Sequence, residues 1–168
     1  WYARPAGGIS SIAKILSGAI NPSGRLVDTY VYDNLSSAAM QNFGDYRYVN
    51  EDGTLSGYSY VNYAEGIYVG YRYYETAADE GLIDYDSVVQ YPFGYGLSYT
   101  SFDEKMGSVA YDAESGTISF DVTVTNTGDV AGKDVVEVYY NPPYTNGGIE
   151  KASANLVSFE KTKELEPG

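Results

Sequence analysis

Apolar residues recur at helical spacing near the start of the chain and at strand spacing near its end. Between residues 7 and 18 they stand three and four positions apart, as in an amphipathic helix. These positions are Ile9, Ile12, Ala13, Ile15 and Leu16. In residues 117–125 every second position is apolar, the pattern of a half-buried antiparallel strand. The pattern therefore predicts a part that begins with a helix, followed by a β part.

A tight turn and a strand are expected after the first helix. Asn21, Pro22 and Gly24 have the residue order of a type I turn. Residues 25–32 are rich in Val, Thr and Tyr, which is typical of a strand. We therefore predict that helix, turn and strand form one αβ unit.

The middle of the chain has weaker patterns. Residues 34–64 show no sustained period, so we predict a long loop there. Because long loops inside compact domains are often functional, it is the first place to look for ligand contacts. Farther on, residues 65–75 favour an extended segment, residues 76–82 a short helix and residues 92–96 a Gly-rich turn.

Beyond residue 102 the sequence predicts several short strands. They are expected at residues 108–111, 117–125, 134–140 and 156–161, with turn signals at 114–116, 126–132 and 141–148. Strands at such spacing are typical of a β-sandwich, which usually has about seven. We therefore predict a boundary near residue 102 and an incomplete antiparallel β-sandwich in residues 103–168.

Composition excludes several functions. The 168 residues include no Cys and no His, which rules out a Cys or His nucleophile, a His base and a Cys/His zinc site. With 23 acidic and 10 basic residues the formal charge is −13, and nucleic-acid binding depends on Lys and Arg, so no nucleic acid is expected as a partner. No apolar run reaches the roughly 20 residues of a membrane span. The lack of Cys fits both a reducing compartment and an exported bacterial protein.

Five segments across nearly the whole chain carry a family pattern. They are Asn-Pro-Ser-Gly-Arg-Leu at 21–26, Glu-Gly-Ile-Tyr-Val-Gly-Tyr-Arg-Tyr-Tyr-Glu at 65–75, Tyr-Pro-Phe-Gly-Tyr-Gly-Leu-Ser-Tyr-Thr-Ser-Phe at 91–102, Val-Thr-Asn-Thr-Gly-Asp-Val-Ala-Gly at 124–132 and Leu-Val-Ser-Phe-Glu-Lys at 156–161. In this order they resemble glycoside hydrolase family 3, the β-glucosidase and β-xylosidase group. Five segments in one order are much more specific than any single match.

This resemblance implies a domain organisation. Residues 1–102 resemble the C-terminal part of the family's α/β sandwich domain, here with a long loop at 34–64, and residues 103–168 resemble a truncated fibronectin type III-like domain. The family's catalytic unit is a (β/α)8 barrel that carries an Asp nucleophile, while a Glu acid/base usually lies on a loop of the sandwich domain. Neither motif matches this chain, so the catalytic residues are expected outside it. The sequences of residues 27–33 and 42–46 are more like those of long bacterial members, in which the barrel follows the fibronectin-like domain.

The resemblance also implies a reaction. The parent, meaning the longer polypeptide of which this chain is expected to be a part, is expected to hydrolyse β-linked glucosides or xylosides with retention and without a cofactor. This chain is expected to be a non-catalytic portion next to the barrel of that polypeptide. A retaining site needs two carboxyl groups about 5–5.5 Å apart. On an extended segment Glu65 and Glu75 would be roughly 33 Å apart at about 3.3 Å per residue, so they are not predicted to be that pair.

Tyrosine is the best local candidate for sugar contact. An aromatic face packs on the C–H side of a pyranose while the hydroxyl remains hydrogen-bonded. Tyr58, Tyr60 and Tyr63 lie in the predicted loop and are the candidate substrate-binding residues, with loop packing as the alternative. Because tyrosine is abundant in the chain, with 20 residues, a second function is also open. This alternative is a non-catalytic carbohydrate-binding or adhesion β-sandwich module.

Two arginines and one Gly-rich stretch receive structural interpretations. Arg25 and Arg72 have the side chain that suits buried bidentate pairing with carboxylates, such as those of Asp28 or Glu65. The stretch at 92–97 has no Gly-Lys-Ser/Thr ending, so a tight turn that packs aromatic rings is predicted there rather than a phosphate cradle.

Overall fold

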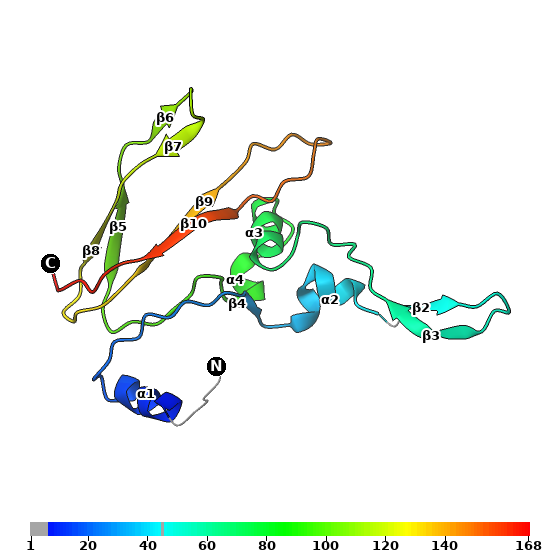
Figure 1. Ribbon diagram of the computed structural model, residues 1–168, viewed down its shortest axis with the longest axis horizontal. Coiled ribbons are helices and arrows are strands. Elements are labelled where there is room, and N and C mark those ends of the chain that lie inside the picture. Colours follow the sequence, from blue (N-terminus) through cyan, green and yellow to red (C-terminus); the bar gives the residue numbers. More distant parts are fainter. Residues whose placement is uncertain (1–6, 45) are drawn as a thin grey trace. The chain divides into compact units, whose positions relative to one another are not determined.

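The computed structural model describes residues 7–44 and 46–168 (Figure 1). They divide into two compact units, and each unit combines segments that are far apart in the sequence. Unit 1 holds residues 7–25, 96–137 and 158–168, and unit 2 holds residues 26–95 and 138–157. The domain boundary expected near residue 102 stays a prediction.

Unit 1 begins with helix α1 (Gly7–Leu16), which confirms the helix expected from the apolar spacing. Gly18 stops the helix: its φ is 74°, and its N–H donates to the carbonyl of Ile15 at 2.9 Å. Such a left-handed glycine is a common helix ending, because it has no Cβ to clash.

The β part of unit 1 contains two short antiparallel pairs. Strand β5 (Phe102–Met106) pairs with β8 (Val122–Asn126), in a register that places Phe102 opposite Asn126. Strand β6 (Ala110–Asp112) pairs with β7 (Thr117–Ser119) around a turn at residues 113–116, where a turn was predicted at 114–116. The strand predicted at 117–125 is thus divided in two, because β7 and β8 have different partners.

Strand β5 is absent from the sequence prediction. Its central residues Asp103, Glu104 and Lys105 are of types that are depleted in strands. The pairing with β8, whose residues alternate strongly, decides its conformation. Propensity alone therefore hides this strand.

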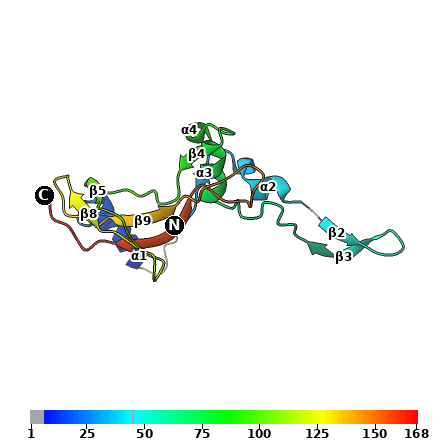
Figure 2. The ribbon, with the colours of Figure 1, turned by 90° about the horizontal axis from the view of Figure 1, so that it is seen from above.

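Strands β9 (Val135–Tyr140) and β10 (Asn155–Lys161) form a third pair (Figure 2). They confirm the strands expected at 134–140 and 156–161. Residues of both units contribute to each strand. In unit 1, Gly132 and Leu165 add an isolated antiparallel bridge.

Unit 2 contains a small buried core around helix α3 (Tyr71–Asp79). Tyr74, Ala77, Val89 and Ala152 are its buried apolar residues. Val89 begins strand β4 (Val89–Tyr91), which follows helix α4 (Tyr85–Val88) and pairs antiparallel with β1 (Tyr30–Val31).

The segment around residues 21–32 differs from expectation. Residues 21–24 form no turn, and the strand predicted at 25–32 is reduced to β1. In unit 1 the side chain of Asn21 bonds to remote groups, donating to the Ala131 carbonyl (3.0 Å) and accepting from the Tyr99 N–H (2.8 Å). The Asn21 side chain is therefore not available for the bond to its own backbone that would favour a local turn.

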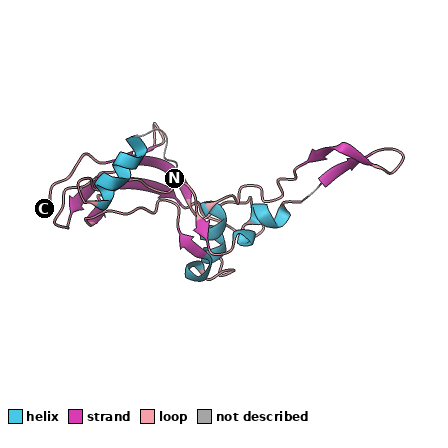
Figure 3. Cartoon of the chain, turned by 90° about the horizontal axis from the view of Figure 1, so that it is seen from below, coloured by secondary structure: helices cyan, strands magenta, loops and turns pink. Residues whose placement is uncertain are grey.

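Residues 34–64 are not one continuous loop. They form helices η1 (Asn34–Ser36) and α2 (Ala38–Asn42), followed by strands β2 (Tyr46–Val49) and β3 (Leu55–Tyr60), which make a hairpin (Figure 3). Asp33 caps η1 by accepting from the Leu35 N–H (2.9 Å), and Ser37 caps α2 in the same way. The helices are too short to show a period, which explains the prediction of a loop.

The extended segment predicted at residues 65–75 is also wrong. Residues 64–67 form turns, and helix α3 covers residues 71–79. Its Val- and Tyr-rich flank favours a strand by propensity, but Tyr74 and Ala77, three residues apart, bury one helical face. Burial of that face selects the helix.

The amide of Asn126 joins three segments of unit 1, around Thr100, residues 126–130 and Leu165. Its Oδ1 accepts from Thr100 Oγ1 (2.6 Å) and the Gly128 N–H (3.1 Å), and its Nδ2 donates to the carbonyls of Val130 (2.8 Å) and Leu165 (2.9 Å). Only 2% of this residue is exposed. A buried amide must have such partners, because an unpaired one costs the full desolvation penalty.

We predict that Asn126→Ala lowers the free energy of unfolding by about 2–3 kcal/mol, because buried carbonyls and a hydroxyl lose their partner. Urea denaturation of both proteins measures this difference. Asn34→Ala is the matched control, since Asn34 is exposed and should change stability little. Equal losses for the two variants would contradict the role of the amide.

Candidate functional site

The three tyrosines expected to contact substrate lie on and just after β3. The exposed fractions of Tyr58, Tyr60 and Tyr63 are 79%, 42% and 79%. The ring of Tyr60 stacks on Tyr46 at a centroid distance of 5.5 Å and tilts against Tyr48 at 5.0 Å. The structure thus brings Tyr60 together with two tyrosines of β2. A substrate role for the three candidates stays a prediction.

Sequence reasoning missed the two tyrosines of β2 as neighbours of Tyr60. The register places Tyr46 directly opposite Tyr60, so the pair forms a cross-strand contact. Tyrosines spaced two apart on either side of the Asp-Gly at 52–53 were the available signal, because such alternation around a turn marks a hairpin.

Arg25 forms the structural ion pair that its sequence context predicts, but with another partner. In unit 1 its guanidinium donates to Asp134 Oδ1, and the two side chains are 19% and 10% exposed. The expected partners were Asp28 or Glu65. Because Asp134 lies 109 residues later, no local pattern identifies it.

Arg72 has no carboxylate at ion-pair distance among the described residues. Its guanidinium carbon lies 5.5 Å from the ring centroid of Tyr71, a cation–π distance. The predicted pairing with Asp28 or Glu65 is therefore wrong for this arginine.

Glu65 and Glu75 do not share an extended strand, so the separation calculated for one does not apply. Glu75 lies in α3 and accepts a hydrogen bond from the Tyr85 hydroxyl at 2.6 Å. Burial, together with this bond, raises the pKa of Tyr85. Glu65 instead lines a pocket.

The Gly-rich stretch is the predicted aromatic turn. In unit 2 the Tyr95 N–H donates to the Pro92 carbonyl at 3.1 Å, and Gly94 between them has a φ of 79°. The Phe93 ring packs 4.7 Å from that of Tyr71, measured between centroids. The stretch therefore packs aromatic rings.

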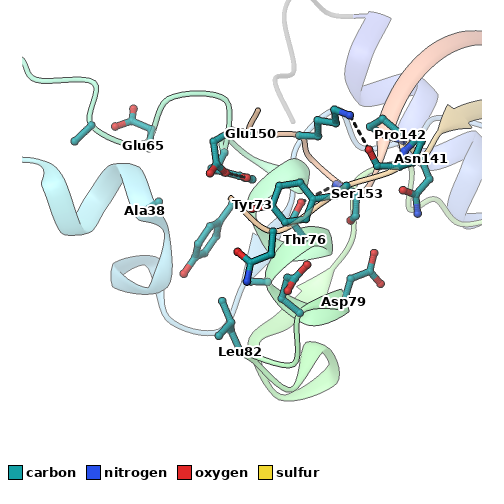
Figure 4. A pocket seen from close by; sticks show the side chains of 18 residues that line it. Ala38, Glu65, Tyr73, Thr76, Asp79, Leu82, Asn141, Pro142, Glu150 and Ser153 are labelled. Carbon is teal, nitrogen blue, oxygen red and sulfur yellow. Dashed lines mark hydrogen bonds between the residues drawn. The ribbon is translucent and has the colours of Figure 1, made fainter. Parts of the chain in front are cut away.

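An open pocket of about 780 Å³ lies in unit 2 (Figure 4). One wall is helix α3 with the residues on either side of it, and another is the connection between β9 and β10. Residues from α3 include Tyr73, Thr76 and Asp79, and those from the connection include Asn141 and Pro142. This volume is in the range of ligand sites in proteins.

The pocket walls carry more negative than positive charge. The charged residues that line it are Glu65, Asp79, Glu80, Glu150 and Lys151. The ammonium of Lys151 donates to the Pro143 carbonyl at 2.7 Å. Four carboxylates and one ammonium leave a negative potential inside the pocket.

Two hydrogen bonds connect the α3 side of the pocket with the β9–β10 connection. The Ser153 N–H donates to Thr76 Oγ1 at 3.0 Å, and the Tyr68 hydroxyl donates to Glu150 Oε2. The second bond, followed by burial, raises the pKa of Tyr68 to about 12. The neutral phenol is therefore maintained as a donor over a wide pH range.

Within the described residues, no group of three or more His, Cys, Asp or Glu is placed to hold a metal ion. In the same part of the chain, no helix combines the length and the apolar character needed to cross a membrane.

Comparisons with known proteins give one consistent group of relatives, although no family model matches the chain. The whole of this chain aligns with β-glucosidase A of Butyrivibrio fibrisolvens at 36% identity. Of this chain, 99% aligns with a β-glucosidase of Ruminococcus albus at 37% identity. It covers 20% and 15% of these two proteins.

Solved structures agree with these relatives. A β-glucosidase from Paenibacillus barengoltzii matches 96% of the chain, with a TM-score of 0.75 and 37% identity. The GH3 β-glucosidase of Bifidobacterium adolescentis matches 96% as well, with a TM-score of 0.75 and 32% identity. The chain covers 15% and 20% of these structures, so it corresponds to a small part of each.

We predict that the stability of the protein falls as pH rises from 10 to about 12, in part through Tyr68. Its pKa is 10.0 ordinarily and about 12 when folded, so in this window the unfolded state loses the proton first. Thermal melting across the window measures the fall, and Tyr68→Phe should make it smaller.

A second variant separates the titration of Tyr68 from that of the other tyrosines. Glu150→Gln removes the negative charge beside Tyr68, so the pKa of Tyr68 should move back toward 10.0. Ultraviolet absorbance of tyrosinate follows this change. Identical titration curves for wild type and Glu150→Gln would contradict the assignment.

Proposed function

The chain belongs to glycoside hydrolase family 3, and from this we propose that it is a non-catalytic portion of a retaining β-glucosidase-like enzyme. The parent is proposed to hydrolyse β-linked glucosides or xylosides, with the nucleophile and the acid/base in other parts of the polypeptide. The two curated relatives named above are β-glucosidases, and each is about five to seven times as long as its match to this chain. This chain contributes scaffold to such an enzyme.

The finer fold assignment is also proposed. Residues 1–102 are assigned to the end of the family's α/β sandwich, and residues 103–168 to a truncated fibronectin type III-like domain. Helix α1 and the pairing of β1 with β4 support the first assignment. Antiparallel pairs β5–β8 and β9–β10 support the second.

The structural use of the family-like segments supports the scaffold role most directly. Asn21, Arg25 and Asn126 come from two of these segments, and each bonds to protein groups within unit 1. Polar side chains that are occupied in this way hold the backbone and are not available to a substrate. A catalytic segment would instead present free carboxyl groups at a fixed separation.

We predict that this polypeptide alone does not release the leaving group of an aryl β-glucoside or β-xyloside faster than buffer. Retaining hydrolysis needs a nucleophile and an acid/base in one rigid site, and no segment matches either motif. The complete polypeptide should hydrolyse the same substrate. Purified chain, with its folding checked by circular dichroism, is assayed beside a preparation that lacks it.

Turnover that persists on repurification and disappears on mutation of a carboxylate within residues 1–168 would place an active site in this chain. A complete polypeptide that binds sugar but never hydrolyses it would favour the adhesion or carbohydrate-binding alternative.

We predict that Tyr58→Ala, Tyr60→Ala and Tyr63→Ala, combined in the complete polypeptide, raise KM more than they lower melting temperature. Tyr58 and Tyr63 are largely exposed, so their removal should cost little stability. Loss of stacking on a sugar is worth about 0.5–1.5 kcal/mol, by analogy with other aromatic pairs.

Tyr111→Ala is the matched control, because Tyr111 is exposed on β6 and belongs to unit 1. It should leave KM unchanged. An unchanged KM in the triple variant, together with a large loss of stability, would show that the three tyrosines are packing residues.

A further inference from the structure

The pocket of unit 2 has the size of a ligand site, and two hydrogen bonds connect its walls. Its volume of about 780 Å³ suits a ligand of one or two sugar rings. The Ser153–Thr76 and Tyr68–Glu150 hydrogen bonds hold its two walls together. Walls fixed before binding reduce the entropy that a ligand must lose.

The acceptor groups of the pocket are largely unused. Within the described residues, the carboxylates of Glu65, Asp79 and Glu80 have no hydrogen-bond or ion-pair partner. Carboxylates act only as acceptors, so a matching ligand must present several hydrogen-bond donors. The hydroxyl groups of a polyol satisfy this requirement.

The charge of the pocket restricts the class of polyol further. Lys151 is the basic residue of the lining, and its ammonium already donates to the Pro143 carbonyl. A phosphorylated or carboxylated sugar would meet uncompensated negative charge.

Aromatic and proline side chains supply the apolar part of the pocket. Tyr68, Tyr73 and Tyr144 line it together with Pro142 and Pro143. A ring face packs well against the C–H side of a pyranose, while carboxylates at the rim accept from its hydroxyl groups. This combination distinguishes a sugar from a flexible, wholly polar polyol.

We propose that this pocket binds a neutral mono- or disaccharide. The carboxylates of Asp79 and Glu80 accept from sugar hydroxyl groups, and Tyr144 packs on a ring face. The inference goes beyond the proposed function and uses no catalytic step. Its failure would leave hydrolysis by the complete polypeptide untouched.

Carboxylate footprinting of the complete polypeptide tests the proposal. Carbodiimide coupling labels accessible carboxylates, and peptide mass spectrometry locates each label. The probe is S-linked thiocellobiose, which resists hydrolysis. At saturation it should reduce labelling of Asp79 and Glu80 at least threefold, while the exposed Glu164 and Glu166 of unit 1 keep their labelling. Glucose 6-phosphate should protect none of them.

Tyr144→Ala should abolish the protection, whereas Tyr140→Ala is the matched control and should keep it. Both tyrosines are exposed, so neither substitution should prevent folding, and Tyr140 does not line the pocket. Hydrolysis is assayed separately on the same preparations. The distinction between the two readouts identifies which proposal fails.

Four outcomes would overturn the inference. Equal labelling with and without thiocellobiose means that the pocket binds no such sugar. Asp79 and Glu80 that resist labelling before sugar is added mean that another part of the polypeptide covers the pocket. Protection that survives Tyr144→Ala means that the sugar acts elsewhere. Equal protection by glucose 6-phosphate means that the charge of the pocket does not select a neutral sugar.

Discussion

The buried amide of Asn126 is the constraint on which unit 1 depends. All four of its hydrogen bonds go to different positions of the chain, from Thr100 to Leu165, so these segments have one arrangement that satisfies it. Gly128 is required beside it, because a Cβ there would lie 2.3 Å from Thr100 Oγ1. The register of β5 with β8 ends at this residue. One polar group thus holds the end of the β5–β8 pair at which β5 begins and β8 ends.

Helix α3 has the corresponding position in unit 2. Tyr74 and Ala77 bury one face of it in the core, while Thr76 and Asp79 line the pocket. At its first turn the Tyr71 hydroxyl accepts from the Leu156 N–H at 2.9 Å, which connects the helix to β10. The same helix therefore holds the small core and shapes the pocket wall.

Some charged side chains of this acidic chain are engaged within the fold, and others are open to solvent. Among the basic residues, Arg25, Lys151 and Lys161 are engaged with protein groups, so their charge is used within the fold. Burial of Glu104, followed by the charge of Asp134, raises the pKa of the Glu104 carboxyl. In the pocket the carboxylates of Glu65, Asp79 and Glu80 stay open, and this contrast between occupied and free polar groups separates scaffold from candidate site.

The sequence by itself determined helix α1, whose apolar residues repeat with a clear local period, and the five segments that identify the family. It also determined strands β9 and β10, which lie next to clear turn signals. It also placed the aromatic turn at residues 92–96. It predicted a helix at residues 76–82 but missed that helix α3 begins at Tyr71. It also did not predict strand β5 or the Asp134 partner of Arg25, and it did not bring the pocket residues together. The local spacing of apolar residues shows only which side of one segment is buried and which is exposed to water. Partners that lie tens to more than a hundred residues away enter only when the chain folds, and burial and pairing with them then outweigh local propensity.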